Sequence, residues 1–350
     1  MTHLKSIIAS PSLRKFFRSL STSTRHPSSI SFSGAGYLGC YHLGVIQYLQ
    51  DTKLLLTPDD YKNGAHQTLL GSSAGSLVSS GILLGLKPED TMPIVSECAK
   101  QARDAGILTS LTPGFSLVDV LDPLLRSKVL STIHEQIGKD GDVDEFLKSR
   151  VNGIAGSPDR LRVFLTDPTK LTRPGHFGSH ALVNDFKDLE HLLSSCILSS
   201  YVPIGTGPLS PSPESCVSKA TEYMKDKNVK RMKKGDGWTV DGDGLEDVPA
   251  KEKWWDGGLA VMFPKIDGKT IMVSPVSIRS KDNIIICPKW LGSDKDGMNI
   301  GSRGLTANTS WENARGAKNM LYATENSEYE KIFGEAYDDA RRVCEENILV

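Results

Sequence analysis

The feature that most constrains the fold is a pair of glycines spaced around a serine, in the run Gly71-Ser72-Ser73-Ala74-Gly75. The run follows the apolar pair Leu69-Leu70 and precedes small residues that continue to Leu86, which predicts a strand, a sharp turn and a helix. The glycines leave room for a turn too tight for a Cβ, and the turn places the Ser73 hydroxyl over the helix N-terminus, where N–H groups favour negative charge. The pattern predicts a nucleophilic serine and acyl-transfer chemistry.

A second glycine pattern lies upstream, in Gly34-Ala35-Gly36-Tyr37-Leu38-Gly39, between a short strand signal at 30–33 and an amphipathic helix through about Gln50. Similar glycines form the phosphate-binding turn of dinucleotide-dependent oxidoreductases. That fold needs an acidic residue at the end of the next strand, and here the next strand ends in the serine turn. The favoured interpretation is that N–H groups around Gly34, Ala35 and Gly36 point at a developing oxyanion.

A nucleophile needs a base, and no motif surrounds any of the eight histidines. A Ser…Asp…His order could use only Asp159 or Asp167 with His176, His180 or His191. Further on, the run Trp254-Trp255-Asp256-Gly257-Gly258-Leu259 places an aspartate before a glycine pair. Asp-Gly is also a turn signal. Because this run follows the glycine loop and the serine turn along the chain, Asp256 becomes a candidate for a serine–aspartate dyad without histidine.

In this order the three patterns resemble those of the patatin-like phospholipases, which combine a GxGxxG oxyanion loop, a GxSxG nucleophile and a DGG or DGA aspartate. The resemblance covers about residues 28–325 and is closest to the animal-type neutral-lipid branch, the adipose triglyceride lipase group, at 31–45, 195–203 and 271–275. It implies a three-layer α/β/α sandwich with a mainly parallel sheet. It also implies Ser73 as nucleophile, Asp256 as base, an oxyanion hole from Gly34, Ala35, Gly36 and Gly39, and motif glycines at Gly71, Gly75, Gly257 and Gly258.

The function implied by this resemblance is hydrolysis of fatty-acyl esters of triacylglycerol or phospholipid, with no metal or organic cofactor. The implied partners are the acyl lipid and a membrane or lipid-droplet surface. A lipid transacylase and a catalytically silent lipid-binding module are the alternatives. A polar insertion at about 209–253 departs from the family pattern and leaves the substrate entrance open.

Composition and residue spacing indicate which other partners and metal ions the chain is expected to bind. A net charge of −1 argues against nucleic acid, and six cysteines without a CxxC pair predict neither a disulfide framework nor a zinc site. Asp241, Asp243 and Glu252 fit a calcium-loop register, but Leu245 occupies a ligand position, so calcium is not favoured. The basic run 219–234 could attract an anionic lipid surface, although a solvated helix face or a disordered loop is the favoured interpretation.

The chain divides into three parts. Residues 1–29 are rich in Ser, Thr and basic residues and contain no acid, which predicts an organelle transit peptide. Mitochondria are the expected destination; the alternatives are a plastid, or a cytoplasmic protein on lipid droplets. Residues 30–325 are expected to form the acyl hydrolase domain, with strands near 68–70, 162–165, 270–273 and 283–287 between helices near 74–86, 91–103, 118–137 and 185–198. Residues 326–350 form a C-terminal helix.

Overall fold

The computed structural model describes residues 26–57, 60–61, 65–106, 108, 111–152, 159–170, 179–227, 229–232, 245–248, 253–266, 270–291, 297–300 and 305–347. Most of the predicted transit peptide lies outside these ranges. Residues 241, 243 and 252 of the calcium-loop pattern and residue 176 lie outside them as well.

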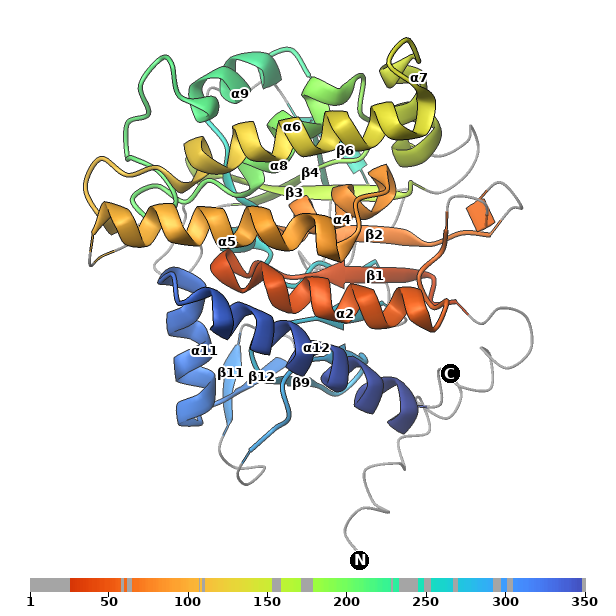
Figure 1. Ribbon diagram of the computed structural model, residues 1–350, viewed down its shortest axis with the longest axis vertical. Helices are drawn as coiled ribbons and strands as arrows, with labels where there is room; N and C mark the ends of the chain where they lie inside the picture. The colour runs from red at the N-terminus through yellow and green to blue at the C-terminus, as the bar shows by residue number, and fades with distance from the viewer. Residues whose placement is uncertain are drawn as a thin grey trace, which may run out of the picture.

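A mixed sheet of nine strands forms the centre of the described fold (Figure 1). Its order is β10-β8-β1-β2-β3-β4-β5-β6, and β7 pairs with β3. The five strands from β10 to β3 are parallel, whereas β4, β5, β6 and β7 join by antiparallel pairing. The sheet confirms the predicted α/β class. The strands are β1 (Ser29–Phe32), β2 (Thr68–Gly71), β3 (Leu161–Asp167), β4 (Ser179–Val183), β5 (Val229–Met232), β6 (Leu245–Val248), β7 (Trp255–Asp256), β8 (Ile271–Val273) and β10 (Ile285–Ile286).

The long helices and the main hydrophobic core lie on one face of this sheet. Side chains alternate along each strand, so Ile30, Phe32 and Leu69 enter that core while Leu70 and Phe164 enter a cluster on the other face. The helices packed over the main core are α2 (Gly39–Asp51), α4 (Ala74–Leu84), α5 (Pro88–Ala105), α6 (Leu117–Ile137), α7 (Val143–Leu147), α8 (Leu189–Ser199), α9 (Cys216–Met224) and α12 (Asn326–Glu346).

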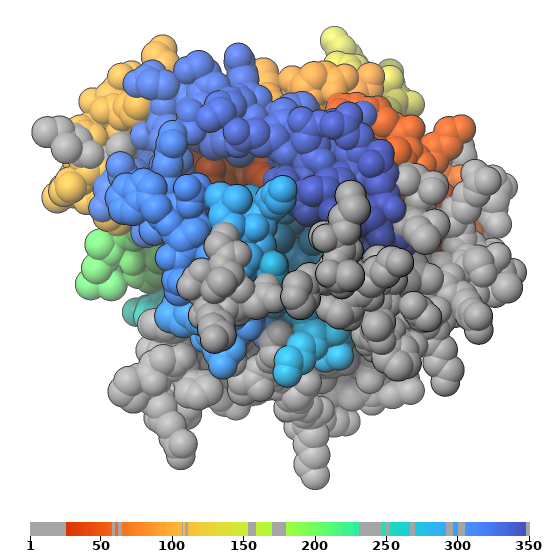
Figure 2. Space-filling view, turned by 90° about the horizontal axis from the view of Figure 1, so that it is seen from below, coloured from red at the N-terminus to blue at the C-terminus, as the bar shows by residue number. Residues whose placement is uncertain are grey.

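The opposite face has a thinner cover. The short helix α10 (Gly257–Ala260) contacts β3 and β4 through the cluster around Phe164 and Val261. A second sheet has the order β11-β12-β9, with β9 (Ile278–Ser280), β11 (Gly297–Ile300) and β12 (Leu305–Asn308), and α11 (Trp311–Leu321) follows it. Figure 2 shows these C-terminal segments, in blue, spread across the lower end of the molecule together with α12.

The predicted insertion at 209–253 is partly regular. It contains α9, and its strands β5 and β6 extend the main sheet beyond β4. Within the basic run, Lys225 and Lys227 pair with Glu222 and Asp226 at 2.5 and 3.0 Å. The described part of this run is therefore a helix followed by a strand, with its own acidic partners.

The described fold includes residues just before the predicted boundary at residue 30. Strand β1 starts at Ser29, and the carbonyl of Pro27 accepts a hydrogen bond from Gln67 Nε2 at 3.1 Å. The predicted C-terminal helix corresponds to α12, whose Tyr337 ring packs edge-on against Tyr48 of α2 with ring centroids 5.3 Å apart.

Candidate active site

Ser73 occupies a strained turn between β2 and α4. Its φ of 54° is positive, a conformation that side-chain-bearing residues seldom adopt, and the Ser76 hydroxyl holds its carbonyl at 2.7 Å. A Cβ on Gly75 would collide with the carbonyl of Phe32 at the end of β1. The glycine therefore lets the turn pack directly against the neighbouring strand, and the Ser73 side chain stands at the N-terminus of α4.

The N–H of Ser73 is supported from α8. It donates to Ser199 Oγ at 3.0 Å, and the Ser199 hydroxyl donates to the carbonyl of Phe164 on β3 at 2.7 Å. Because Ser199 is the last residue of α8, the position of this helix fixes the nucleophile turn.

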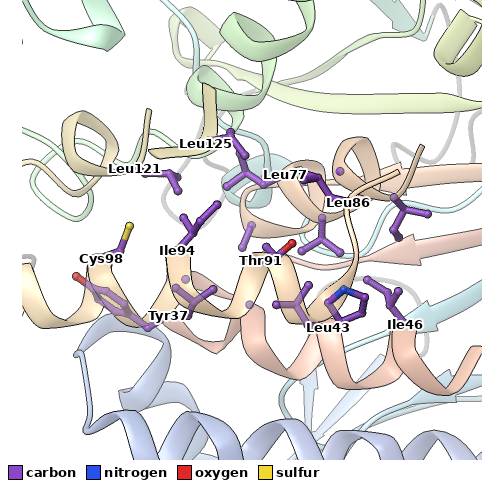
Figure 3. Close-up of a pocket in the computed structure, with 18 of the residues that line it drawn as sticks. Tyr37, Leu43, Ile46, Leu77, Leu86, Thr91, Ile94, Cys98, Leu121 and Leu125 are labelled. Atoms are coloured by element: carbon purple, nitrogen blue, oxygen red, sulfur yellow. The ribbon is translucent and has the colours of Figure 1, made fainter. Parts of the chain in front are cut away.

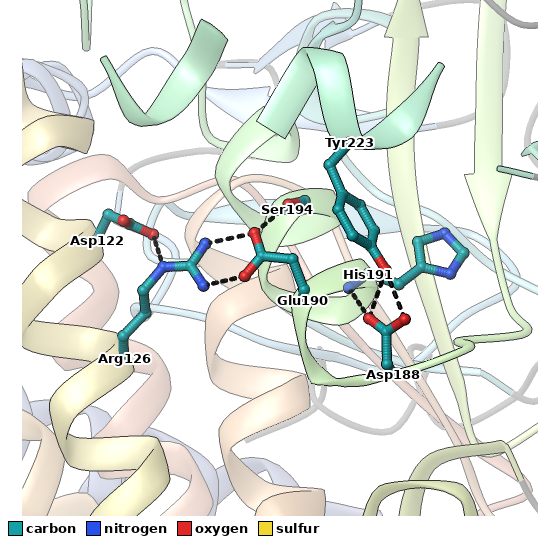
Figure 4. A network of polar contacts seen from close by, with 7 residues as sticks. All are labelled: Asp122, Arg126, Asp188, Glu190, His191, Ser194 and Tyr223. Carbon is teal, nitrogen blue, oxygen red and sulfur yellow. Dashed lines mark hydrogen bonds and ion pairs between the residues drawn. The ribbon is translucent and has the colours of Figure 1, made fainter. Parts of the chain in front are cut away.

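Two groups of polar side chains hold α8 in place (Figure 4). Arg126 of α6 donates to both carboxylate oxygens of Glu190, at 2.5 and 3.0 Å, and to Asp122 at 2.7 Å. Asp188 caps the helix and accepts from the Tyr223 hydroxyl of α9. These contacts tie the helix that supports Ser73 to two neighbouring helices.

Asp256 ends the short strand β7 and faces Ser73. Its carboxylate accepts a hydrogen bond from the N–H of Gly258 at 2.7 Å, and the Ser73 side chain lies close enough to lower the pKa of this carboxyl group. Its carbonyl accepts from the Thr166 hydroxyl at 2.7 Å, and its N–H donates to the carbonyl of Tyr201 at 2.8 Å. Burial raises the pKa of Asp256 to about 7, although Ser73 and the Gly258 N–H act in the opposite direction. At neutral pH this carboxyl group can therefore both accept and release a proton.

The upstream glycine loop lies against the same turn. A Cβ on Gly34 would lie 3.4 Å from the Ser73 Cβ, and one on Gly258 would lie 3.9 Å from the Gly34 Cα, so the three motifs meet. No residue in the described ranges accepts a hydrogen bond from the N–H of Gly34 or Ala35. Two unpaired donors beside a hydroxyl form a suitable site for developing negative charge.

The other glycines of these motifs allow close packing. Gly36 has a φ of 52°, and its Cβ would collide with the carbonyl of Met320 in α11. A Cβ on Gly39 would lie 3.9 Å from that of Ala74. Added Cβ atoms would also collide with backbone carbonyls at Gly71, which packs on Gly75, and at Gly257, which packs on Phe164.

The histidines considered as bases are placed differently. His191 is fully buried in the first turn of α8, about 12 Å along the helix axis from Ser199. Burial lowers the pKa of His191 to about 4, and its ring packs against Phe186. His180 lies opposite Thr166 on β4. The carboxyl group whose pKa the Ser73 side chain lowers is that of Asp256.

No set of three or more His, Cys, Asp or Glu side chains in the described ranges is arranged to hold a metal ion. Among the helices that the structure describes, none combines the length and apolar character needed to cross a membrane.

An apolar cavity opens beside the serine turn, between α2, α4, α5 and α6 (Figure 3). It encloses about 830 Å³, including open solvent at its mouth. Gly36, Gly39 and Ala74, the residue that follows Ser73, line it, and the α4 residues from Ala74 to Ile82 extend it for about 12 Å. The wall also includes Tyr37, Leu43, Ile46, Leu77, Val78, Leu86, Ile94, Cys98, Leu121 and Leu125. Such a cavity fits an unbranched hydrocarbon chain.

Ser199 and the cavity were not predicted from the sequence. Ser199 lies in the block 195–203 that carries part of the family resemblance, so that block was the available signal. The cavity residues have the helical spacing of ordinary core positions and gave no signal of their own.

Three curated proteins place the chain among known relatives. Human 1-acylglycerol-3-phosphate O-acyltransferase PNPLA3 is 28% identical over 185 residues, which are 53% of this chain and 31% of that protein. Patatin-like phospholipase domain-containing protein 2 of Mus musculus is 26% identical over 184 residues, with the same coverage of 53% and 31%. Human patatin-like phospholipase domain-containing protein 4 is 27% identical over 253 residues, 72% of each chain. The chain is a distant homologue of the patatin-like phospholipases, at 26–28% identity to these three proteins.

The region of similarity spans less than a third of the length of the first two of these relatives. No protein-family model matches it. Among solved structures, VipD from Legionella pneumophila aligns with a TM-score of 0.44 at 13% identity, over 92% of this chain and 67% of VipD.

Proposed function

We propose that this patatin-like protein hydrolyses fatty-acyl esters of lipids, with Ser73 as nucleophile and Asp256 as general base. The observation that carries the proposal is that the Ser73 side chain and the buried Asp256 carboxyl group lie together, beside the unpaired N–H groups of Gly34 and Ala35. This distant homology supports lipid acyl chemistry, since two of the relatives are called patatin-like phospholipase domain-containing proteins.

The proposed reaction has two steps. Ser73 Oγ attacks the ester carbonyl carbon while Asp256 accepts the hydroxyl proton, and the oxyanion is stabilised by the glycine-loop N–H groups. The tetrahedral intermediate collapses, the acyl–oxygen bond breaks, and Asp256 returns the proton to the leaving alcohol. Water then attacks the acyl-enzyme, Asp256 accepts a water proton, and collapse releases the fatty acid as Ser73 recovers its proton from Asp256.

The cavity supports a hydrocarbon acyl chain as the recognised part of the substrate. It begins at Ala74, the residue after Ser73, and its lining is almost entirely apolar. Burying each CH₂ group of a chain there contributes about 0.8 kcal/mol. The proposed substrates are triacylglycerol or phospholipid, met at a membrane or lipid-droplet surface, with the acyl chain in the cavity and the head group outside it.

A lipid panel assayed with purified protein tests this function. Ser73→Ala and Asp256→Asn should each reduce ester hydrolysis by several orders of magnitude, and the double variant should be hardly slower than either, because nucleophile and base act as one unit. Ser72→Ala is the matched control, since that buried hydroxyl belongs to the same turn but donates to the Met262 carbonyl. Losses that multiply in the double variant contradict the dyad. Absence of both hydrolysis and fluorophosphonate labelling indicates a silent lipid-binding module.

Transfer of the acyl group to another alcohol is a second candidate activity. It is favoured by two relatives, PNPLA3, whose name describes an acyltransferase, and human omega-hydroxyceramide transacylase, 24% identical over 186 residues. Adding glycerol or a monoacylglycerol as acceptor and measuring the ratio of transfer product to free fatty acid distinguishes transacylation from hydrolysis.

We also propose a mitochondrial address in residues 1–29, based on their basic, acid-free and Ser/Thr-rich composition. Residues 1–35 fused to a fluorescent reporter should carry it into mitochondria, and Arg14→Glu with Arg18→Glu should prevent import. Plastid targeting of the reporter, or a diffuse or lipid-droplet signal, contradicts the mitochondrial destination.

A further inference from the structure

Within the described ranges, the His42 side chain of α2 makes one hydrogen bond, and its partner is the residue just before the glycine loop. The side chain is fully buried, and its Nε2 lies 2.8 Å from the carbonyl oxygen of Ser33. A carbonyl only accepts hydrogen bonds, so Nε2 carries the proton. Nδ1 makes no hydrogen bond within the described structure, and burial lowers the pKa of His42 to about 4. The ring is therefore a neutral single donor aimed at one carbonyl.

The peptide between Ser33 and Gly34 links this contact to the candidate oxyanion site. In a trans peptide the carbonyl of one residue and the N–H of the next point in opposite directions. By holding the Ser33 carbonyl toward α2, His42 directs the N–H of Gly34 away from α2. That N–H has no acceptor in the described ranges, and Gly34 lies beside Ser73.

The next peptide is fixed in the same way. The Ser33 hydroxyl donates to the carbonyl of Gly34 at 3.0 Å, which directs the N–H of Ala35. Glycine has a broad choice of backbone conformations, so the peptides around Gly34 need side-chain contacts to keep one orientation.

We propose that His42 is a positioning residue that sets the orientation of the Gly34 N–H for the oxyanion, and that the Ser33 hydroxyl does the same for Ala35. The inference rests on the proposed hydrolysis at Ser73. It gives His42 a role through the loop backbone, since its only donor is engaged by Ser33 and it does not act as a base.

The test compares His42→Phe, which keeps a ring but removes the donor, with His42→Gln, whose amide can donate from nearly the same position. His42→Phe should lower kcat by about a hundredfold, the scale of losing one oxyanion donor, with KM almost unchanged. His42→Gln should recover most of the loss. The affinity for a trifluoromethyl ketone, which forms a charged hemiketal with Ser73, should fall in parallel with kcat, while the affinity for the corresponding methyl ketone should not.

A stable His42→Phe protein with unchanged kcat, a loss confined to KM, or equal weakening of both ketones overturns the positioning role. If His42→Phe does not fold, Ser33→Ala serves instead, because it removes a buried hydroxyl at little cost in volume, and the same ketone comparison applies to Ala35. Wild-type activity that is absent, or that survives Ser73→Ala, refutes the proposed function itself and the positioning role with it. Wild-type activity that requires Ser73 but not the donor at residue 42 refutes only the positioning role.

Discussion

Replacing Asp256 by asparagine is expected to abolish ester hydrolysis and to stabilise the folded chain at alkaline pH. The residue is 4% exposed, and burial raises its pKa from 3.8 to about 7 despite the opposing effects of the Ser73 side chain and the Gly258 N–H. The folded protein therefore holds this proton more tightly than the unfolded chain. The stability that this proton contributes is fully present below the unfolded pKa of 3.8 and is lost as the pH rises through about 7.

The size of the effect follows from the shift. One pKa unit corresponds to about 1.4 kcal/mol, so this group alone should lower the free energy of unfolding by about 3 kcal/mol between pH 5 and pH 8. Asparagine keeps an acceptor for the Gly258 N–H and has no charge. The difference in free energy of unfolding between Asp256→Asn and wild type should therefore grow by that amount over this interval.

Urea denaturation at both pH values measures the difference, and the linear extrapolation gives each free energy. Asp104→Asn, at an exposed position of α5, is the control and should show almost no change in its difference from wild type. A difference for Asp256→Asn that is constant with pH, or equal growth in the control, would refute the reasoning that burial perturbs this carboxyl.

Three further predictions concern catalysis. The acid limb of kcat/KM should have its midpoint near pH 7, because only ionised Asp256 accepts the proton; rates from pH 5 to pH 9 measure it, and a midpoint below 5 contradicts it. Gly34→Ala should lower kcat about tenfold or more with little change in Tm. Gly36→Ala, whose added Cβ collides with α11, should lower Tm by several degrees. Equal changes in Tm for the two variants contradict the packing argument. Val78→Phe should narrow the cavity and lower kcat/KM for palmitoyl relative to octanoyl esters, and an unchanged ratio would place the acyl chain elsewhere.

Local sequence patterns were sufficient to predict the elements that carry the motifs. The helix predicted at 74–86 is α4 (Ala74–Leu84), the one at 118–137 is α6 (Leu117–Ile137), and the strand at 68–70 is β2 (Thr68–Gly71). Apolar periodicity and glycine punctuation act within a few residues, so these elements are specified without the rest of the chain. The catalytic roles of Ser73 and Asp256 remain predictions, although the structure brings the two side chains together.

Other features depend on contacts between distant segments. Val78 and Leu121 have the helical spacing of core residues, and only the packing of α4 against α6 leaves a cavity between them. The residues Val229 to Met232 lie in a polar stretch and lack the alternation of apolar and polar residues that marks a strand, so the antiparallel strands beyond β4 were not predicted. From the sequence alone, His42 could be interpreted only as a packing residue. Its contact with the Ser33 carbonyl depends on the turn from β1 into α2, which the sequence does not show.

Two energetically unfavourable features of the described structure lie at the serine and aspartate motifs. Ser73 is one of three described non-glycine residues with positive φ, and strain of this kind costs roughly 1–3 kcal/mol. Asp256 adds the cost of a buried charge. The polar contacts around the motifs come from the buried side chains of Ser199, Thr166 and His42, on three different elements. Polar support at such positions stabilises one geometry of the site rather than the fold, so substitutions there should reduce activity far more than they reduce stability.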